Sequence, residues 1–208
     1  DLLENAKLEK NLPVVLSDSE INRMLDAVDK STFHGYRNAL EIEILYSCGL
    51  RISELLNLKT SDIYWTHEYI KVLGKGNKER LVPIGESALR HLRYFIDNHL
   101  SKLNIDKKCK GLIFLNHYGR QLTRQHVFQM IKDLAKEVGI NKNIHPHTLR
   151  HSFATELIRG GANLVVVKDM MGHQSILSTE IYTHVDINHL RETIMLYHPL
   201  YNKKAWQE

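Results

Sequence analysis

The stretch His145-Pro146-His147-Thr148-Leu149-Arg150-His151 predicts the start of a helix with basic side chains in its first turns. Proline is favoured at the first helical position, and the predicted helix runs to about Arg159, where Gly160-Gly161 stops it. His147 and Arg150 are three residues apart, so a helix brings them onto one face. A helix N-terminus adds a partial positive charge of its own. This face could therefore hold a phosphate.

The chain on the C-terminal side of this helix is also predicted to be helical. Asn163 can cap a helix that continues through Met171, and Gly172 ends it. A short helix is predicted around Tyr182. A last helix is predicted over residues 187–197, stopped by Pro199.

The N-terminal part contains three further helix signals. A break at Leu12-Pro13 is followed by Ser17-Asp18-Ser19-Glu20, which has the form of a capping box. The expected helices cover residues 18–28, 36–48 and 52–58, and the second is ended by a glycine at position 49.

The middle of the chain changes pattern and predicts a β-hairpin. Residues 69–73 and 80–84 are short strand-like runs on either side of Gly74-Lys75-Gly76-Asn77-Lys78. Helical periodicity returns over residues 87–98 and 123–138. The predicted fold class is mainly α with a small antiparallel β-sheet (α+β).

Composition indicates one main globular domain, because the chain has 208 residues and 43% are hydrophobic. Cys48 and Cys109 lie far apart and form no CxxC pattern, so neither a disulfide framework nor a cysteine zinc site is indicated. A reducing cytoplasm is the simplest location. The longest wholly apolar runs, such as residues 164–167, fall far short of the roughly 20 residues that span a bilayer, so no membrane association is expected.

Charge is distributed unevenly along the chain. Residues 1–70 carry 7 Lys and Arg against 12 Asp and Glu, residues 71–150 carry 16 against 6, and residues 151–208 carry 5 against 6. The sums are −5, +10 and −1, so the basic residues are concentrated in the middle segment. Such a segment suits a phosphate backbone, although a solvated basic face explains it equally well when taken alone.

A second candidate segment is Gly49-Leu50-Arg51-Ile52-Ser53-Glu54, which also places an arginine near a helix start. Taken alone, Arg51 could simply pair with Glu54 three residues later, and the histidines of the later segment could be ordinary surface or core residues. Tyr182 could likewise pack in the core beside Ile181 and Val185.

The ordered set of these segments resembles the tyrosine recombinase (phage integrase) family, most closely its Xer branch. His147-x-x-Arg150, Met171-Gly172-His173 and residues 178–185 (STEIYTHV) are similar to the family's second box in order and spacing. Residues 49–58 are similar to its first box. Residues 74–83 (GKGNKERLVP) resemble the hairpin that brings the family's catalytic lysine. A constellation at matched spacing is far more specific than any one triplet.

The resemblance implies a role for each of six residues. Tyr182 corresponds to the nucleophile, Arg51 and Arg150 to the phosphate-binding arginines, and Lys75 to the general acid. His147 corresponds to the proton-sharing or general-base histidine, and His173 to the histidine that hydrogen-bonds the phosphate. Such chemistry has physical reasons: two guanidinium groups stabilise the charge that builds on the non-bridging oxygens, and a phenol with a pKa of about 10 needs a proton acceptor or a cationic field to attack at neutral pH.

The resemblance also implies partners and a domain organisation. Double-stranded DNA is the expected substrate, cut through a 3′-phosphotyrosyl link by a homo- or hetero-tetramer on paired sites, with a Holliday junction and without metal or other cofactor. Expected location is the cytoplasm, at the nucleoid. Residues 1–12 are interpreted as the linker from a missing N-terminal DNA-binding domain, 13–198 as the catalytic domain and 199–208 as a tail. The helix over residues 187–198 could dock on its own chain or on a neighbouring protomer.

Two other functions remain open at this point. A DNA-binding module without catalysis is one, since residues 153–171 superficially resemble a helix-turn-helix. That hypothesis gives no role to Arg51, Lys75 and Tyr182. A metal hydrolase is the other, because alternating histidines can bind zinc, and its four candidate ligands are His145, His147, His151 and His173. It lacks a carboxylate placed beside them as general base.

Overall fold

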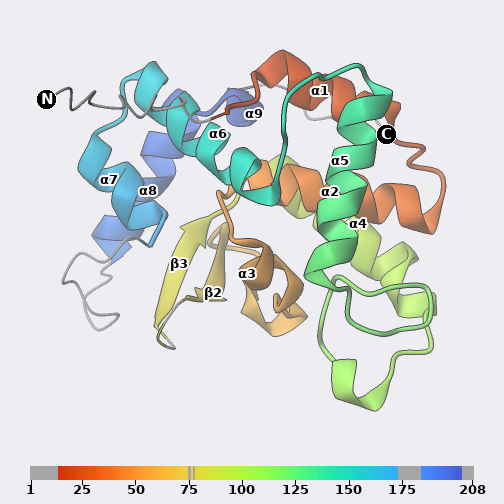
Figure 1. The fold of residues 1–208 in the computed structure, drawn as a ribbon. Helices are drawn as coiled ribbons and strands as arrows, with labels where there is room; N and C mark the ends of the chain where they lie inside the picture. Colours follow the sequence, from red (N-terminus) through yellow and green to blue (C-terminus); the bar gives the residue numbers. More distant parts are fainter. Residues whose placement is uncertain (1–13, 75, 77, 173–183, 203–208) are drawn as a thin grey trace, which may run out of the picture.

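A computed structural model of the chain describes residues 14–74, 76, 78–172 and 184–202 (Figure 1). Its helices are α1 (Asp18–Ala27), α2 (Phe33–Ser47), α3 (Ile52–Leu56), α4 (Glu86–Asn98), α5 (Arg124–Glu137), α6 (Pro146–Gly160), α7 (Leu164–Met170), α8 (His184–Tyr197) and α9 (Pro199–Asn202). Its strands are β1 (Ile63–Tyr64), β2 (Tyr69–Leu73) and β3 (Glu79–Pro83). Short 3₁₀ turns cover Thr60–Asp62, Leu100–Lys102 and Lys107–Cys109. The predicted mainly helical class is confirmed.

Side-chain caps explain where several helices begin. The predicted capping box at α1 is present: the Ser17 hydroxyl accepts from the Glu20 amide, and the Ser17 amide donates to the Glu20 carboxylate at 2.8 Å. Asn163 caps α7 as predicted, by accepting from the Val165 amide. α2 begins three residues earlier than predicted, because the Thr32 hydroxyl accepts from the Gly35 amide and starts the helix there.

Helix α2 forms the centre of the main core. Nearly all of its residues are buried, and it packs against α1, α3, α4 and α6 (Figure 1). The side chains of Leu40, Ile44 and Leu45 are fully buried in the core cluster. Because α6 packs directly on α2, the end of α2 and the first turns of α6 are held close together. Those two places carry the arginines singled out in the sequence.

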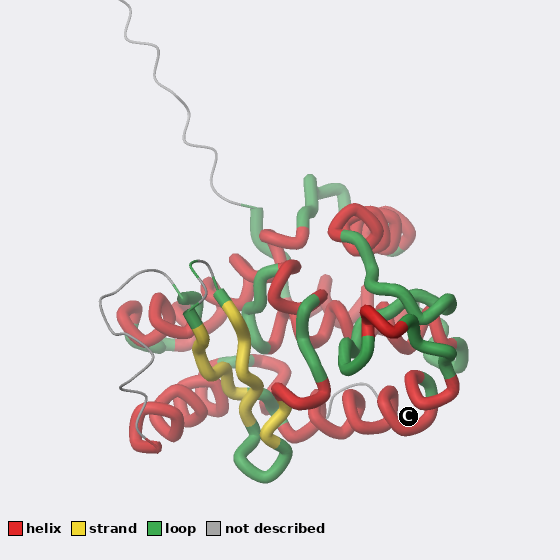
Figure 2. Tube along the Cα trace, turned by 90° about the horizontal axis from the view of Figure 1, so that it is seen from below, coloured by secondary structure: helices red, strands yellow, loops and turns green. Residues whose placement is uncertain are grey.

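The sheet is small, antiparallel and ordered β1-β2-β3. Lys71 pairs with Leu81 and Leu73 with Glu79, which confirms the predicted hairpin. Strand β1 was not predicted, because two residues are too few to leave an alternating pattern. Figure 2 shows the three strands in yellow, surrounded by a chain that is otherwise helix and loop.

The C-terminal helices pack on their own chain. α8 contacts α6 and β3, and its Leu190 and Ile194 are buried with Phe153 and Leu157 in a second, smaller core. In this structure the helix therefore docks in cis, one of the two arrangements that the sequence left open. Residues 199–202, the beginning of the predicted tail, form α9.

The helix predicted around Tyr182 lies outside the described residues. Among those that are described, no helix has the length and apolar character needed to cross a membrane.

Candidate active site

Gly49 turns the chain from α2 into α3 and so places Arg51. Its φ of +59° lies in the left-handed region, and an added Cβ would come within 2.4 Å of the Phe153 ring, so only glycine fits both the backbone and the space. Arg51 is the N-cap residue of α3, and its backbone amide donates to the Glu54 carboxylate at 2.7 Å. The arginine therefore sits at a helix start, as predicted.

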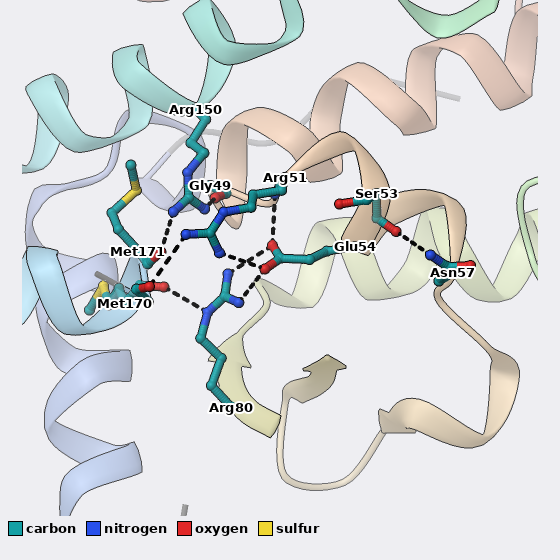
Figure 3. Close-up of polar contacts among 10 residues, drawn as sticks. Gly49, Arg51, Ser53, Glu54, Asn57, Arg80, Arg150, Met170 and Met171 are labelled. Carbon is teal, nitrogen blue, oxygen red and sulfur yellow. Dashed lines mark hydrogen bonds and ion pairs between the residues drawn. The ribbon is translucent and has the colours of Figure 1, made fainter. Parts of the chain in front are cut away.

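Arg150 is buried on α6, with only 5% of its surface exposed. Its Nη1 donates to the carbonyl of Gly49 and its Nη2 to the carbonyl of Met171, so the guanidinium bridges the end of α2 and the end of α7 (Figure 3). Pro146 is the first residue of α6, and His147 follows it with an exposed side chain. His147 thus faces solvent one turn before Arg150.

The C-terminal end of α7 binds three arginines through three consecutive carbonyls. The Met170 carbonyl accepts from Arg80 Nε at 3.1 Å, that of Met171 from Arg150, and that of Gly172 from Arg51 Nη2 at 3.3 Å. The last carbonyls of a helix have no partner within it and carry partial negative charge. They therefore fix three guanidinium groups that would otherwise repel one another.

Glu54 lies among these arginines and has a side chain only 1% exposed. Its Oε1 is 2.9 Å from Arg51 Nη1 and 2.5 Å from Arg80 Nη1, and its Oε2 is 2.9 Å from Arg80 Nη2 (Figure 3). Burial favours the neutral carboxyl, but the hydrogen bonds and charge of Arg80, with those of Arg51, outweigh it and lower the pKa of Glu54. Glu54 is therefore ionised at neutral pH.

The four side chains do not balance in charge: three positive groups and one negative group leave +2 in a largely buried cluster. Burial, followed by the positive charges of the neighbours Arg51 and Arg80, lowers the pKa of Arg150 to about 10. At pH 7 it remains protonated, and the repulsion that lowers its pKa is relieved by any anion that enters. Each guanidinium has five N–H donors, of which Arg51 and Arg150 each use two in the bonds above. The cluster is thus suited to a phosphate.

Three of the six predicted site residues can be placed. Arg51 and Arg150, ninety-nine positions apart in sequence, meet at the cluster, and His147 lies on the helix turn before Arg150. The other three, Lys75, His173 and Tyr182, lie outside the described residues. Gly74, which precedes Lys75, is within reach of the cluster: an added Cβ there would be 3.6 Å from Arg80 Nη1.

Arg80 was missed by the sequence reasoning, although it lies within the quoted hairpin motif. Its signal was the alternation of β3, where Arg80 and Val82 are buried and share the inward face. An arginine in an inward position of a strand needs a buried partner, and here that partner is Glu54. The pairing of Arg51 with Glu54, expected if Arg51 were only structural, is present as well and forms part of the same cluster.

His145 takes no part in the cluster. Its ring stacks on Phe128, with centroids 5.3 Å apart, and it serves as the N-cap residue of α6. His145 therefore helps to form the start of α6.

Comparison with known proteins identifies the family. Residues 14–189 match the phage integrase family. The chain belongs to this family. Tyrosine recombinase XerD of Staphylococcus haemolyticus (strain JCSC1435) is 41% identical over 198 residues, which cover 95% of this chain and 67% of the relative. A second XerD, from Listeria innocua serovar 6a, is 42% identical over 95% of this chain and 66% of its own length. The predicted resemblance to Xer-like tyrosine recombinases is confirmed.

Solved structures of recombinases share the fold. The crystal structure of XerA recombinase matches with a TM-score of 0.69 and 34% identity, over 91% of this chain and 67% of that one. The XerH site-specific recombinase bound to its difH substrate, a pre-cleavage complex, matches with a TM-score of 0.67 and 27% identity, over 88% of this chain and 50% of that one. The chain thus spans between half and about two thirds of the proteins it matches.

Proposed function

We propose that this chain is the catalytic part of a site-specific DNA recombinase that cuts and rejoins strands through Tyr182. The observation that carries the proposal is the meeting of Arg51 and Arg150 in a buried cluster with a net charge of +2, at the end of α7. A chain that only bound DNA would contact phosphates from its surface and would not need to bury unbalanced cations, which is costly.

The proposed reaction follows from the charges. The phenolic oxygen of Tyr182 attacks a backbone phosphorus, the bond from phosphorus to the 5′ oxygen breaks, and that oxygen takes a proton. The products are a 3′-phosphotyrosyl ester and a 5′-hydroxyl. Arg51 and Arg150 bind the non-bridging oxygens, where negative charge grows in the transition state. The ester keeps the energy of the cut bond, so a 5′-hydroxyl of another strand can attack it and restore the backbone without ATP.

The remaining roles come from the family resemblance and are part of the proposal. His147 accepts or shares the phenolic proton, His173 hydrogen-bonds the phosphate, and Lys75 protonates the leaving oxygen as general acid. A lysine ammonium carries the proton that this step requires. We further propose that four protomers act on two sites through a Holliday junction, in the cytoplasm at the nucleoid.

A nicked duplex that loses its short 5′-hydroxyl fragment after cleavage tests this function. The duplex carries the recombination site of the Staphylococcus haemolyticus XerD relative, and binding is first established by gel shift. We expect a covalent protein–DNA species on a denaturing gel, formed also in excess chelator and lost in Tyr182→Phe. DNA that is bound without any adduct would leave the non-catalytic binding module as the better description. An adduct or product lost only in chelator would favour the metal hydrolase.

A further inference from the structure

Arg80 occupies the centre of the cluster but is none of the six residues to which the reaction assigns a role. It is 6% exposed, on the inward face of β3. Its two terminal nitrogens grip the two oxygens of Glu54 at 2.5 and 2.9 Å, and its Nε donates to the Met170 carbonyl at 3.1 Å (Figure 3). Arg80 thus joins the hairpin, α3 and the end of α7.

Glu54 is shared between Arg80 and Arg51. Its Oε1 contacts a terminal nitrogen of each arginine, and its Oε2 contacts Arg80 and the backbone amide of Arg51. A carboxylate that forms a two-pronged pair with one guanidinium has its charge largely neutralised by that partner. Arg51 is left with a single side-chain contact to Glu54, and its Nη2 turns to the Gly172 carbonyl.

We propose that Arg80 is a positioning residue for the strand-cleavage reaction, which keeps Arg51 available to the phosphate by occupying Glu54. The inference rests on the proposed recombinase function. Without Arg80, the cluster's net charge would fall from +2 to +1, and Glu54 could form its two-pronged pair with Arg51 instead. The guanidinium of Arg51 would then be turned toward α3 and its charge cancelled.

The second contact of Arg80 supports the same role. Met170, Met171 and Gly172 present successive carbonyls to Arg80, Arg150 and Arg51, so a shift at the first carbonyl displaces the other two. Gly172 also packs on the Arg80 side chain, because an added Cβ there would be 3.3 Å from Arg80 Cδ. Arg80 therefore sets the position of the backbone that holds both phosphate-binding arginines.

A purely structural role would not need a charge at this position. An apolar pair of similar volume in place of a buried ion pair is often as stable or more so. Here the buried charge also raises the cost of keeping Arg150 protonated, since Arg80 is among the causes that lower the pKa of Arg150. A charged Arg80 is explained if Glu54 must be neutralised mainly by Arg80, so that Arg51 keeps N–H donors for the phosphate.

The test uses single-turnover cleavage of the nicked duplex at saturating DNA, with DNA affinity measured separately. Four variants are compared with wild type: Arg80→Met, Arg80→Lys, Glu54→Gln and the double variant Arg80→Met/Glu54→Gln. We expect Arg80→Met to slow adduct formation by roughly 100-fold, as small misplacements of catalytic groups do, with little change in affinity. Arg80→Lys keeps the charge and loses the two-pronged grip, so its defect should be smaller.

The double variant separates positioning from packing. If Glu54 harms Arg51 once Arg80 is gone, Glu54→Gln should recover about tenfold of the rate lost in Arg80→Met, a coupling typical of residues in direct contact. Lys71→Met is the matched control, because it breaks an ion pair on the same hairpin. The Lys71–Glu79 pair is 3.2 Å long, partly exposed and does not include Glu54. The Lys71→Met variant should cleave at the wild-type rate.

Two results would overturn the role of Arg80: wild-type cleavage by Arg80→Met, or a fold-loss of rate in the double variant that equals the product of the two single fold-losses. Thermal unfolding monitors folding in every case. Should Arg80→Met fail to fold, Arg80→Lys and the double variant carry the test, because the first keeps the charge and the second removes both partners. A wild-type protein that binds the duplex and forms no adduct would instead contradict the proposed function.

Discussion

Among the described residues, two regions bury an arginine together with a glutamate, and the two differ in how their charges balance. In the cluster of Arg51, Arg80 and Arg150, one carboxylate serves three guanidinium groups. On α2, Arg37 and Glu41 form a one-to-one pair at 3.1 Å, with side chains 1% and 0% exposed. The first region holds three guanidinium groups for one carboxyl group, whereas the second holds one for one.

The two regions also differ in the hydrogen-bond partners of their arginines. Arg37 donates to the Leu115 carbonyl at 3.1 Å and the Asn38 side chain at 2.9 Å, and it contacts His126 at 3.1 Å. Together with Glu41, these partners occupy the polar atoms of the Arg37 guanidinium. Arg150 is fixed by two backbone carbonyls, and Arg51 by one carbonyl and one oxygen of Glu54. A carbonyl holds a guanidinium without cancelling its charge. Burial of arginine therefore points to function only where the surrounding charges are left unbalanced.

The largest expected effect is the loss of cleavage in Arg150→Gln. Removal of one donor to a developing oxyanion typically slows the chemical step by roughly 100- to 1,000-fold. Single-turnover adduct formation at saturating DNA measures it. Arg37→Met, which removes an equally buried arginine, should cleave at the wild-type rate once folded. Equal loss of cleavage in Arg150→Gln and Arg37→Met would show that the two buried arginines do not differ in their importance for catalysis.

Stability should follow the opposite order. Arg37→Met removes the hydrogen bonds to the Leu115 carbonyl and the Asn38 side chain and leaves these acceptors without their donor, which costs about 3 kcal/mol of the free energy of unfolding. Arg150→Gln should cost less, because the loss of two hydrogen bonds is offset by relief of repulsion from Arg51 and Arg80. Urea unfolding of both variants at pH 7 compares them. A larger cost for Arg150→Gln would contradict the charge imbalance.

The pH dependence of stability should separate Glu54 from Glu41. The pKa of Glu54 is lowered in the fold, so its contribution is present above its ordinary value of 4.5 and is lost as the pH falls below it. Burial, only partly opposed by Arg37, raises the pKa of Glu41 to about 7, so its contribution is present below 4.5 and is lost as the pH rises through 7.

Glu41→Gln should therefore gain stability relative to wild type between pH 4.5 and 7.5, by up to about 3 kcal/mol. The deficit of Glu54→Gln should instead shrink only below pH 4.5. Urea unfolding at a series of pH values measures both differences. If the free energies of unfolding of the two variants changed with pH in parallel, the two carboxylates would have similar environments, which would contradict the opposite pKa shifts of Glu54 and Glu41.

The smallest effect expected is that of Gly49→Ala. A left-handed backbone and a Cβ at 2.4 Å from the Phe153 ring should destabilise the fold by about 2 kcal/mol. Because the Gly49 carbonyl binds Arg150, cleavage should also slow in the folded variant. Gly111→Ala is the matched control: its φ is +86°, but an added Cβ meets nothing within 4 Å. Unimpaired cleavage by Gly49→Ala would show that the turn at Gly49 does not position the arginine cluster.

Local signals in the sequence were sufficient for most of the fold. Ser17, Asn163 and Pro146 start helices through short-range chemistry that can be read directly, and the hairpin follows from alternation around glycine. The start of α2 was placed at Tyr36 because the cap at Thr32 was overlooked. Strand β1 depends on pairing with β2, and no local pattern encodes it.

The sequence could predict individual site residues but not how they come together. Arg51 and Arg150 could be singled out by their motifs, but their meeting depends on how α6 packs on α2, which is tertiary. Glu54 and Arg80 could not be recognised as members of the cluster, since a carboxylate shared by two arginines 26 and 3 positions away is visible only in three dimensions. Lys75, His173 and Tyr182 stay predictions.

A substrate whose scissile phosphate is replaced by a neutral methylphosphonate gives the most direct test of the central claim. If the cluster's surplus charge acts on the negative charge of the phosphate, the defect of Arg150→Gln should shrink by about tenfold or more on this substrate, because there is less charge to stabilise. Adduct formation by wild type and variant is compared on both substrates. An equal defect on the charged and neutral substrates would show that Arg150 does not act through the phosphate charge, and the account would be contradicted.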